Sequence, residues 1–292
     1  MTIPEAKRIQ RDFYRLINPT EEDRFLFAEA LDYLITETKD SDYMVDLGGM
    51  YYEQKRFDLA LKYYEMAAES GNLYAISNLG YVWYYGRTGE RNFEKSFYYF
   101  DKARQMGDVI AAYKIADMYK NGYYVKRDYA KYKAIIEELY PQVKNARRLN
   151  EPLPEIFTRL ARIRTEEGKP EEALKLYDVA RDFLSQRLQV HSFFGDLNIM
   201  KWMIGDIYKL RAFDRNFFEL YDLYYLLGSP VKVRFVFEET PHEVEAVREG
   251  TVLSIRFDES WYRTVDDFFQ KASIGGDLLT SLYEDLYDWE VL

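Results

Sequence analysis

The sequence of 292 residues contains no cysteine and only two histidines, His191 and His242. The lack of cysteine excludes disulfides, thiolate metal sites and cysteine nucleophiles. Neither histidine lies in a serine-elbow or comparable context, so no nucleophile–histidine pair is indicated. No apolar run approaches the roughly 20 residues of a membrane span, and the first residues lack the apolar core of a signal peptide. We therefore expect a soluble, cytoplasmic protein without a membrane partner.

Phosphate-binding glycine loops are also missing, because Gly48-Gly49 and Gly275-Gly276 have neither the P-loop nor the dinucleotide spacing. The segment 238–243 holds three glutamates and His242, which are groups that can ligate a divalent metal. A proline-containing turn between two strands is usually only solvated, however. We expect no cofactor, no metal and no catalysis.

An enzyme of unknown type in the C-terminal part of the chain is one alternative to that expectation. Its functional groups would have to come from one of two acidic clusters. These are His242 with Glu243 and Glu245, and the pair Asp266 and Asp267.

A short phrase recurs along the first half of the chain, with a small residue at its centre. Its copies are Leu47-Gly48-x-x-Tyr51, Leu79-Gly80-x-x-Trp83 and Ile115-Ala116-x-x-Tyr119. The central residues are 32 and 36 positions apart, and a second apolar pattern of helical spacing follows each copy. A fixed period of this length is typical of stacked helix pairs.

Small residues at fixed places in each unit allow two antiparallel helices to approach closely, while tyrosine and phenylalanine fill the remaining volume. The sequence contains 28 Tyr and 19 Phe, in keeping with such a repeat. We interpret the small positions as structural; they are Gly48, Ala60, Ala67, Gly80, Ala103 and Ala116.

On these motifs, and on the loop-like segments 84–92 and 120–128, residues 21–228 resemble the Sel-like repeats, a relative of the tetratricopeptide repeat. A further unit follows at 160–180. The last copy is weak and consists of Ile204-Gly205-x-x-Tyr208 with Phe213, Phe217, Tyr221 and Leu226. Residues 181–203 fit the period poorly, so a bend or an irregular helix is expected there.

The resemblance implies a mainly α fold, a right-handed helical-repeat solenoid over residues 1–228 with an N-terminal helix and about five helix pairs. The helical period stops near Gly228, and residues 229–292 indicate a small acidic α+β domain. Alternating residues predict strands at 231–237, 243–247 and 251–257. Two helices are expected after them, one capped by Thr264 and one over 277–287.

Charge opposes a nucleic-acid partner, because the net charge is −10 even though residues 114–148 are locally basic and rich in tyrosine. The resemblance implies a non-catalytic, bacterial-type adaptor that binds a protein or peptide in the concave groove of its first helices. The partner-binding residues would be Tyr52, Tyr81, Tyr84, Lys114 and Lys120.

A second binding hypothesis rests on residues 229–292, which have six basic and fourteen acidic side chains and so carry −8 of the total charge. Such a domain could neutralise a basic partner, as an immunity or inhibitor protein does. Electrostatic steering would then set the association rate.

Overall fold

The computed structural model describes residues 1–16, 19–190, 195–211, 220–228, 230–249 and 252–292. Contacts within the chain define two compact units, Met1–Gln142 and Val143–Leu292. The predicted domain boundary at 228/229 differs from the division between these two units and stays a prediction.

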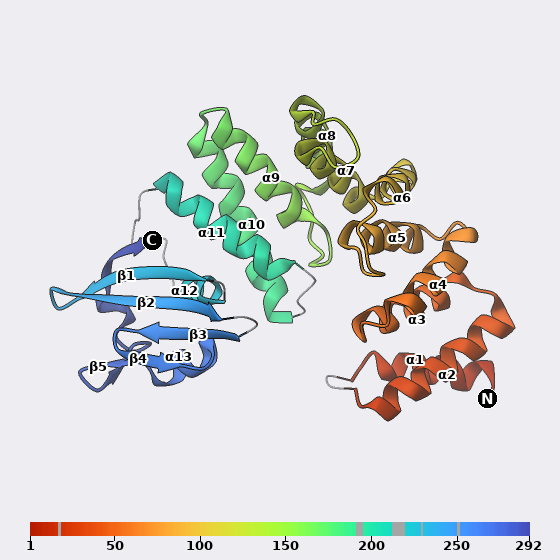
Figure 1. Ribbon diagram of the computed structural model, residues 1–292, viewed down its shortest axis with the longest axis horizontal. Coiled ribbons are helices and arrows are strands. Elements are labelled where there is room, and N and C mark those ends of the chain that lie inside the picture. Colours follow the sequence, from red (N-terminus) through yellow and green to blue (C-terminus); the bar gives the residue numbers. More distant parts are fainter. Residues whose placement is uncertain (17–18, 191–194, 212–219, 229, 250–251) are drawn as a thin grey trace. The chain divides into compact units, whose positions relative to one another are not determined.

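Consecutive antiparallel helices make up the first unit, from red to olive in Figure 1. One pair, α1 and α2, precedes the three pairs in which the short phrase recurs, so more than one helix stands before the first copy. The helices are α1 (Ile3–Phe13), α2 (Glu21–Thr38), α3 (Ser41–Glu53), α4 (Phe57–Glu69), α5 (Leu73–Tyr85), α6 (Phe93–Gln105), α7 (Val109–Asn121) and α8 (Tyr129–Val143).

Local sequence sets the helix ends of this unit. Asn72 caps α5 by accepting a hydrogen bond from the backbone N–H of Ala75, and Asp108 caps α7 in the same way. Gly86 and Gly122 end α5 and α7 in the left-handed conformation, with φ of 63° and 72°. Each helix therefore stops where a long inter-helix loop must begin.

Glycine–aromatic contacts hold the first and second helices of a pair together. A Cβ on Gly48 would stand 2.7 Å from the Tyr64 ring, and one on Gly80 would stand 2.5 Å from the Phe100 ring. Tyr64 and Phe100 are both buried. The close approach of α3 to α4 and of α5 to α6 thus depends on the missing side chain.

In the second unit, α9 (Leu153–Glu166), α10 (Pro170–Val190), α11 (Asp196–Arg211) and α12 (Leu220–Leu227) are joined partly by buried ion pairs. Arg187 on α10 is 2% exposed and bonds Glu155 of α9 at 2.8 Å and Asp196 of α11 at 2.6 Å. Arg162 of α9 donates to Asp206 of α11 at 2.6 Å. Ionic contacts therefore link three successive helices.

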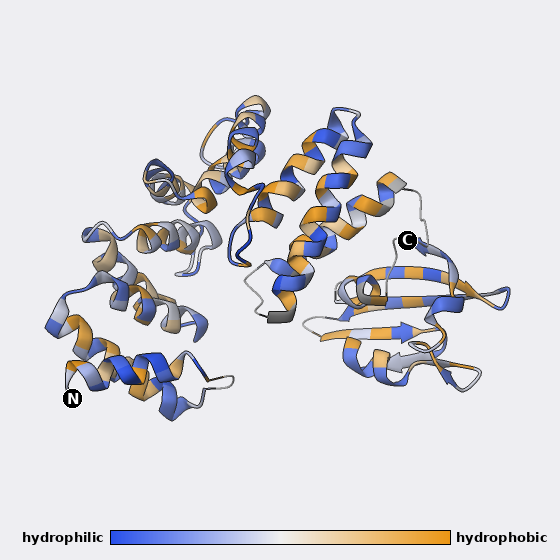
Figure 2. Ribbon diagram, turned by 180° about the vertical axis from the view of Figure 1, so that it is seen from behind, coloured by the Kyte–Doolittle hydropathy of each residue, from blue (hydrophilic) through white to orange (hydrophobic). Residues whose placement is uncertain are grey.

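The remainder of this unit is an antiparallel sheet of five strands in the order β4-β3-β2-β1-β7. Its buried face carries Phe235 and Phe257, against which Phe268 of the helix α13 (Val265–Lys271) packs. Hydropathy alternates along these strands in Figure 2, as expected for one covered and one solvated face. The strands are β1 (Val231–Phe237), β2 (Thr240–Glu249), β3 (Val252–Phe257), β4 (Ser260–Tyr262) and β7 (Tyr287–Val291).

Two expectations for this part of the chain are confirmed and one is wrong. The three predicted strands are present, but β2 begins at Thr240 because the turn lies at Glu238 and Glu239, both with positive φ. Thr264 caps α13 as expected. The predicted helix over 277–287 is wrong, because the segment forms the hairpin strand β6 (Asp277–Leu278) with β5 (Ser273–Ile274), then a short 3-10 turn, and then β7, which pairs with β1.

The predicted irregularity over 181–203 falls partly outside the described residues. Helix α10 runs without a break to Val190, and α11 begins at Asp196. His191 lies between them in a segment that the structure does not describe. Phe213 and Phe217 of the weak last repeat also lie outside the described residues, and Gly205 meets no described atom within 4 Å of a Cβ built on it.

Candidate functional site

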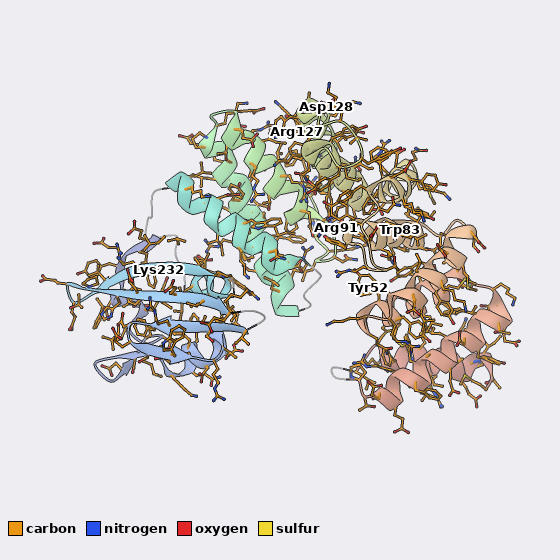
Figure 3. All side chains as sticks on the ribbon, viewed as in Figure 1. Tyr52, Trp83, Arg91, Arg127, Asp128 and Lys232 are labelled. Carbon is orange, nitrogen blue, oxygen red and sulfur yellow. The ribbon has the colours of Figure 1, made fainter. Side chains whose placement is uncertain are left out.

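Tyrosine side chains and two basic residues gather on the first helices of the repeats and on the loop that follows α5. We call this group the tyrosine–cation cluster. It consists of Tyr52 on α3, Tyr81, Tyr84 and Tyr85 on α5, Arg87 in the following loop, and Tyr113 and Lys114 on α7. Tyr52 is labelled in Figure 3, in the first unit.

Lys114 is surrounded by aromatic rings. Its Nζ lies 5.1 Å from the ring centroid of Tyr81, 5.4 Å from that of Tyr84 and 5.8 Å from that of Tyr85, all on α5. The ring of Tyr113, beside it on α7, is 5.5 Å away. These distances allow cation–π attraction and direct the ammonium group toward α5.

Arg87 joins the first and second repeats. Its Nε donates to the hydroxyl of Tyr52 at 2.8 Å, and its guanidinium lies 5.4 Å from the ring centroid of Phe57. The same guanidinium is 5.2 Å from the ring centroid of Tyr85. Tyr85 therefore lies within cation–π distance of both Arg87 and Lys114.

Equivalent positions of the repeats explain why these side chains meet. Asp46, Asn78 and Lys114 each stand two residues before the small residue of the motif, and stacking brings such positions into one row. Lys114 contacts α5, the first helix of the preceding repeat. Asp46 likewise contacts α1, the first helix of the preceding pair, where Gln10 Nε2 donates to its carboxylate at 2.7 Å. The row therefore begins with an acid and ends with a base.

Asp46 sits in an environment that disfavours its charge. Burial raises the pKa of this carboxyl, and the nearby carboxylates of Asp42 and Asp40 raise it further. Hydrogen bonds from Tyr14 and Gln10 act in the opposite direction.

The structure brings together most of the predicted partner-binding residues. Tyr81, Tyr84 and Lys114 are in one cluster, and Tyr52 is connected to it through Arg87. Lys120 is not part of it, because its Nζ lies 4.9 Å from the ring centroid of the buried Tyr132 on α8. Their role in binding stays a prediction.

Sequence reasoning missed three members of the cluster: Tyr85, Arg87 and Tyr113. Tyr85 could have been found from spacing, since it continues the row Tyr74, Asn78, Tyr81 along one face of α5. Arg87 lies in a loop and carries no periodic signal. The six predicted structural positions, Gly48, Ala60, Ala67, Gly80, Ala103 and Ala116, are all buried.

The acidic groups considered for catalysis or metal binding have other contacts in the sheet domain. His242 Nδ1 is 2.7 Å from Asp258 Oδ2, and Glu243 lies between Lys232 and Arg234 at 2.7 and 2.8 Å. These two cations lower the pKa of Glu243. The structure groups no three His, Asp or Glu side chains around a possible metal position within its described residues.

The other three residues of that alternative also have partners. Glu245 accepts a hydrogen bond from Arg256 at 2.7 Å. Asp267 pairs with Lys271, and Asp266 accepts from the hydroxyl of Tyr224 at 3.0 Å. Glu245 and Asp266 thus contact a neighbouring strand or helix, whereas Asp267 pairs within its own helix α13.

Comparison with known families decides what the first unit is. The sequence model of the Sel1 repeat matches residues 41–72, 73–108 and 109–135, which correspond to the pairs α3–α4, α5–α6 and α7–α8. Residues 41–135 are Sel1 repeats. This agrees with the resemblance found in the sequence, and repeats of this kind commonly mediate protein binding.

Solved structures show the same type of fold. A Sel1 repeat protein from Oxalobacter formigenes superimposes with a TM-score of 0.51 at 17% identity, over 78% of this chain and 82% of that one. No curated protein matches the sequence. At this identity the likeness concerns the fold alone.

Two further solved structures have lower scores. A protective antigen of uropathogenic Escherichia coli with the same repeat fold gives a TM-score of 0.42 at 19% identity, over 78% of this chain and 52% of that one. A tetratricopeptide repeat protein from Parabacteroides merdae gives 0.44 at 13% identity, over 76% and 84%. Among the helices described here, none is long and apolar enough to cross a membrane.

Proposed function

We propose that this protein is a non-catalytic adaptor that holds a segment of another protein against its first helices α3, α5 and α7. The observation that carries the proposal is the division of labour within each Sel1 repeat. Small residues and buried rings fix the helix pairs, while the tyrosine–cation cluster places tyrosines and Lys114 on the first helices and Arg87 in the loop that follows α5.

Tyrosine rings suit this task because they offer a large contact area with few rotatable bonds, and their hydroxyls accept and donate hydrogen bonds. Tyr74 extends the same face of α5 and is 70% exposed. It stands four residues before Asn78 and seven before Tyr81, which places these side chains in one row.

Site-specific photo-cross-linking tests this proposal. A photoreactive phenylalanine analogue replaces Tyr74 on the first helix α5 or, as a control, Tyr98 on the second helix α6, which is 60% exposed. Cells expressing each full-length variant are irradiated, and cross-linked proteins are identified by mass spectrometry. We expect a specific partner from position 74 and none from position 98. Capture from position 98 alone would show that binding does not use the first helices.

The acidic C-terminal part supports a second candidate, neutralisation of a basic partner as in immunity or inhibitor proteins. Lys232, Arg234 and Arg256 are already paired with glutamates across the open face of the sheet. Lys232 is labelled on β1 in Figure 3. Because these three bases are already paired, they do not offset the excess of acidic side chains in residues 229–292. An association rate that falls steeply as the salt concentration rises would favour this candidate. So would loss of binding when Glu238 and Glu239 are both replaced by glutamine.

A further inference from the structure

We propose that one edge of the first unit binds the surface of a lipid bilayer that contains anionic phospholipids. This edge, the basic edge, consists of residues 54–59, 86–95 and 122–131. These segments join the first helix of each Sel1 repeat to the second and include the first turn of the second helix. The inference does not involve the first-helix surface of the proposed adaptor function, so each can fail without the other.

Basic side chains are in excess on this edge. Its three segments carry eight basic and four acidic residues, a net charge of +4. The matching segments at the opposite edge, which join each second helix to the next first helix, carry one basic and three acidic residues, a net charge of −2. The latter segments are 39–43, 70–75 and 106–111. The two edges of the repeats therefore differ in the sign of their charge.

Seven of the eight bases are exposed, and none of the seven forms an ion pair with a carboxylate among the described residues. Arg91 and Arg127 stand at the same position of consecutive repeats, 36 residues apart, and are labelled in Figure 3. Of the acids, Asp128 accepts a hydrogen bond from the backbone N–H of Lys131 at 2.9 Å. The other five exposed bases are Lys55, Arg56, Lys95, Lys126 and Lys131.

Aromatic rings hold three of these cations in a row. In each repeat the ring three residues after the small residue of the motif lies within cation–π distance of one base. The pairs are Arg56 with Tyr51 at 5.0 Å, Lys95 with Trp83 at 4.0 Å and Lys131 with Tyr119 at 4.8 Å. Packed helices are about 8–10 Å apart, so the row extends over about 20 Å. Cation–π contacts order these side chains and leave their formal charge in place.

A continuous anionic surface suits this row better than a strand of nucleic acid does. Single strands bind in basic grooves with aromatic faces open for base stacking, whereas the rings of this row already stack with cations and the row follows loops. A bilayer can contact all three loops at once. Tyr124, which is 57% exposed and two residues before Lys126, adds an amphipathic ring of the kind enriched at membrane interfaces.

Neither the net charge of −10 nor the lack of an apolar span opposes such binding. Charges more than about 8 Å away are largely screened at physiological ionic strength, so the local excess on the edge governs the attraction. Peripheral binding needs no spanning helix. The expectation of no membrane partner depended on the lack of a span, and it does not extend to a protein that lies on the bilayer surface.

Vesicle co-sedimentation of the full-length protein tests the inference. The vesicles consist of phosphatidylcholine alone or of equal parts phosphatidylcholine and phosphatidylglycerol. We expect sedimentation with the anionic vesicles only, and less of it as the salt concentration rises. The triple variant Arg91→Gln, Lys126→Gln and Arg127→Gln should weaken binding about fivefold per residue, or about a hundredfold in all.

A second triple variant is the matched control. Lys39→Gln, Lys62→Gln and Lys102→Gln change the net charge equally at exposed positions outside the basic edge. This variant should bind the anionic vesicles as the parent does. Melting temperatures near that of the parent are expected for both triple variants, because none of the six side chains is buried.

The absence of cysteine allows a second measurement, which does not depend on charge changes. A single cysteine replaces Thr88 on the basic edge or Ser70 on the opposite edge, both exposed, and is labelled with a polarity-sensitive fluorophore. Anionic vesicles should shift the emission of the label at position 88 to shorter wavelength and leave that at position 70 unchanged. Excess inorganic phosphate at constant ionic strength should leave the shift intact, because a free ion does not bridge the three loops.

Several results would overturn the inference. These are no sedimentation with the anionic vesicles, equal weakening by the two triple variants, a shift at position 70 without one at position 88, and loss of binding in inorganic phosphate. Binding of labelled polyglutamate or of a single-stranded oligonucleotide, without binding of anionic vesicles, would assign the edge to another class of polyanion and equally exclude the bilayer.

Discussion

Gly80 on α5 lies so close to the ring of Phe100 on α6 that a Cβ on Gly80 would stand 2.5 Å from Phe100 Cδ1. Phe100 is fully buried, so its ring has no open space to enter. Ser96, also buried on α6, donates its hydroxyl to the carbonyl oxygen of Gly80 at 3.0 Å. The two helices are thus fixed at this point by a steric and a polar contact.

Replacing Gly80 should therefore destabilise the first unit. We expect Gly80→Ala to lower the free energy of unfolding by about 1–3 kcal/mol through overpacking, and Gly80→Leu to prevent stable folding. Gly49→Ala is the control, because its Cβ would meet nothing closer than 3.9 Å. That change should stabilise helix α3 by about 0.5–1 kcal/mol. Urea unfolding measures both; a Gly80→Ala variant as stable as the parent would contradict the packing described here.

Asp46 gives a prediction about pH. Because its pKa is raised in the folded protein, the ionised carboxyl costs stability at neutral pH, and this cost is relieved as the pH falls through the folded pKa toward the unfolded value near 4. Asp46→Asn should raise the melting temperature at pH 7 and remove the relative gain at acid pH. The exposed Asp58→Asn serves as control, and a melting temperature that falls at pH 7 in Asp46→Asn would contradict the assignment.

Arg187 is the centre of a buried ionic group, so its removal should be costly. Arg187→Met leaves the carboxylates of Glu155 and Asp196 without this partner, and we expect a loss of about 3–5 kcal/mol in thermal or urea unfolding. Adding Glu155→Gln and Asp196→Asn to this variant should restore much of the lost free energy of unfolding. In contrast, Arg104→Met breaks an ion pair with Asp101 at the surface, whose side chains are 42% and 28% exposed, and the loss should be about 0–1 kcal/mol. Equal effects of the two arginine variants would refute a special role of burial.

Trp289 tests the placement of the last strand. It is 3% exposed and its ring centroid lies 4.7 Å from that of Phe235, in the core beneath the sheet. Trp289→Ala should cost about 3–5 kcal/mol of stability. Trp261 on β4 is 58% exposed, so Trp261→Ala should change stability by about 0.5 kcal/mol or less. Tryptophan fluorescence and urea unfolding distinguish the two; similar costs would place β7 outside the core.

The error over residues 277–287 shows what pattern alone cannot decide. Leu278, Leu279, Leu282 and Leu286 recur at a spacing that is compatible with a helix. In the structure Leu279 and Leu286 are buried while Leu278 is exposed, and the chain turns instead of continuing. Strand β1 gains a second hydrogen-bonded neighbour from β7, a long-range benefit that no local pattern reports.

The sequence by itself determined the repeat period, the alternation of first and second helices, the cap at Thr264, and the strands β1, β2 and β3. These features depend on interactions within about four residues, which the order of side chains specifies directly. Only the tertiary structure decided that Arg87 meets Tyr52, 35 residues earlier, and that Lys114 lies among the rings of the preceding helix. Such contacts depend on how one repeat stacks on the next, because stacking turns residues far apart in sequence into neighbours on one surface.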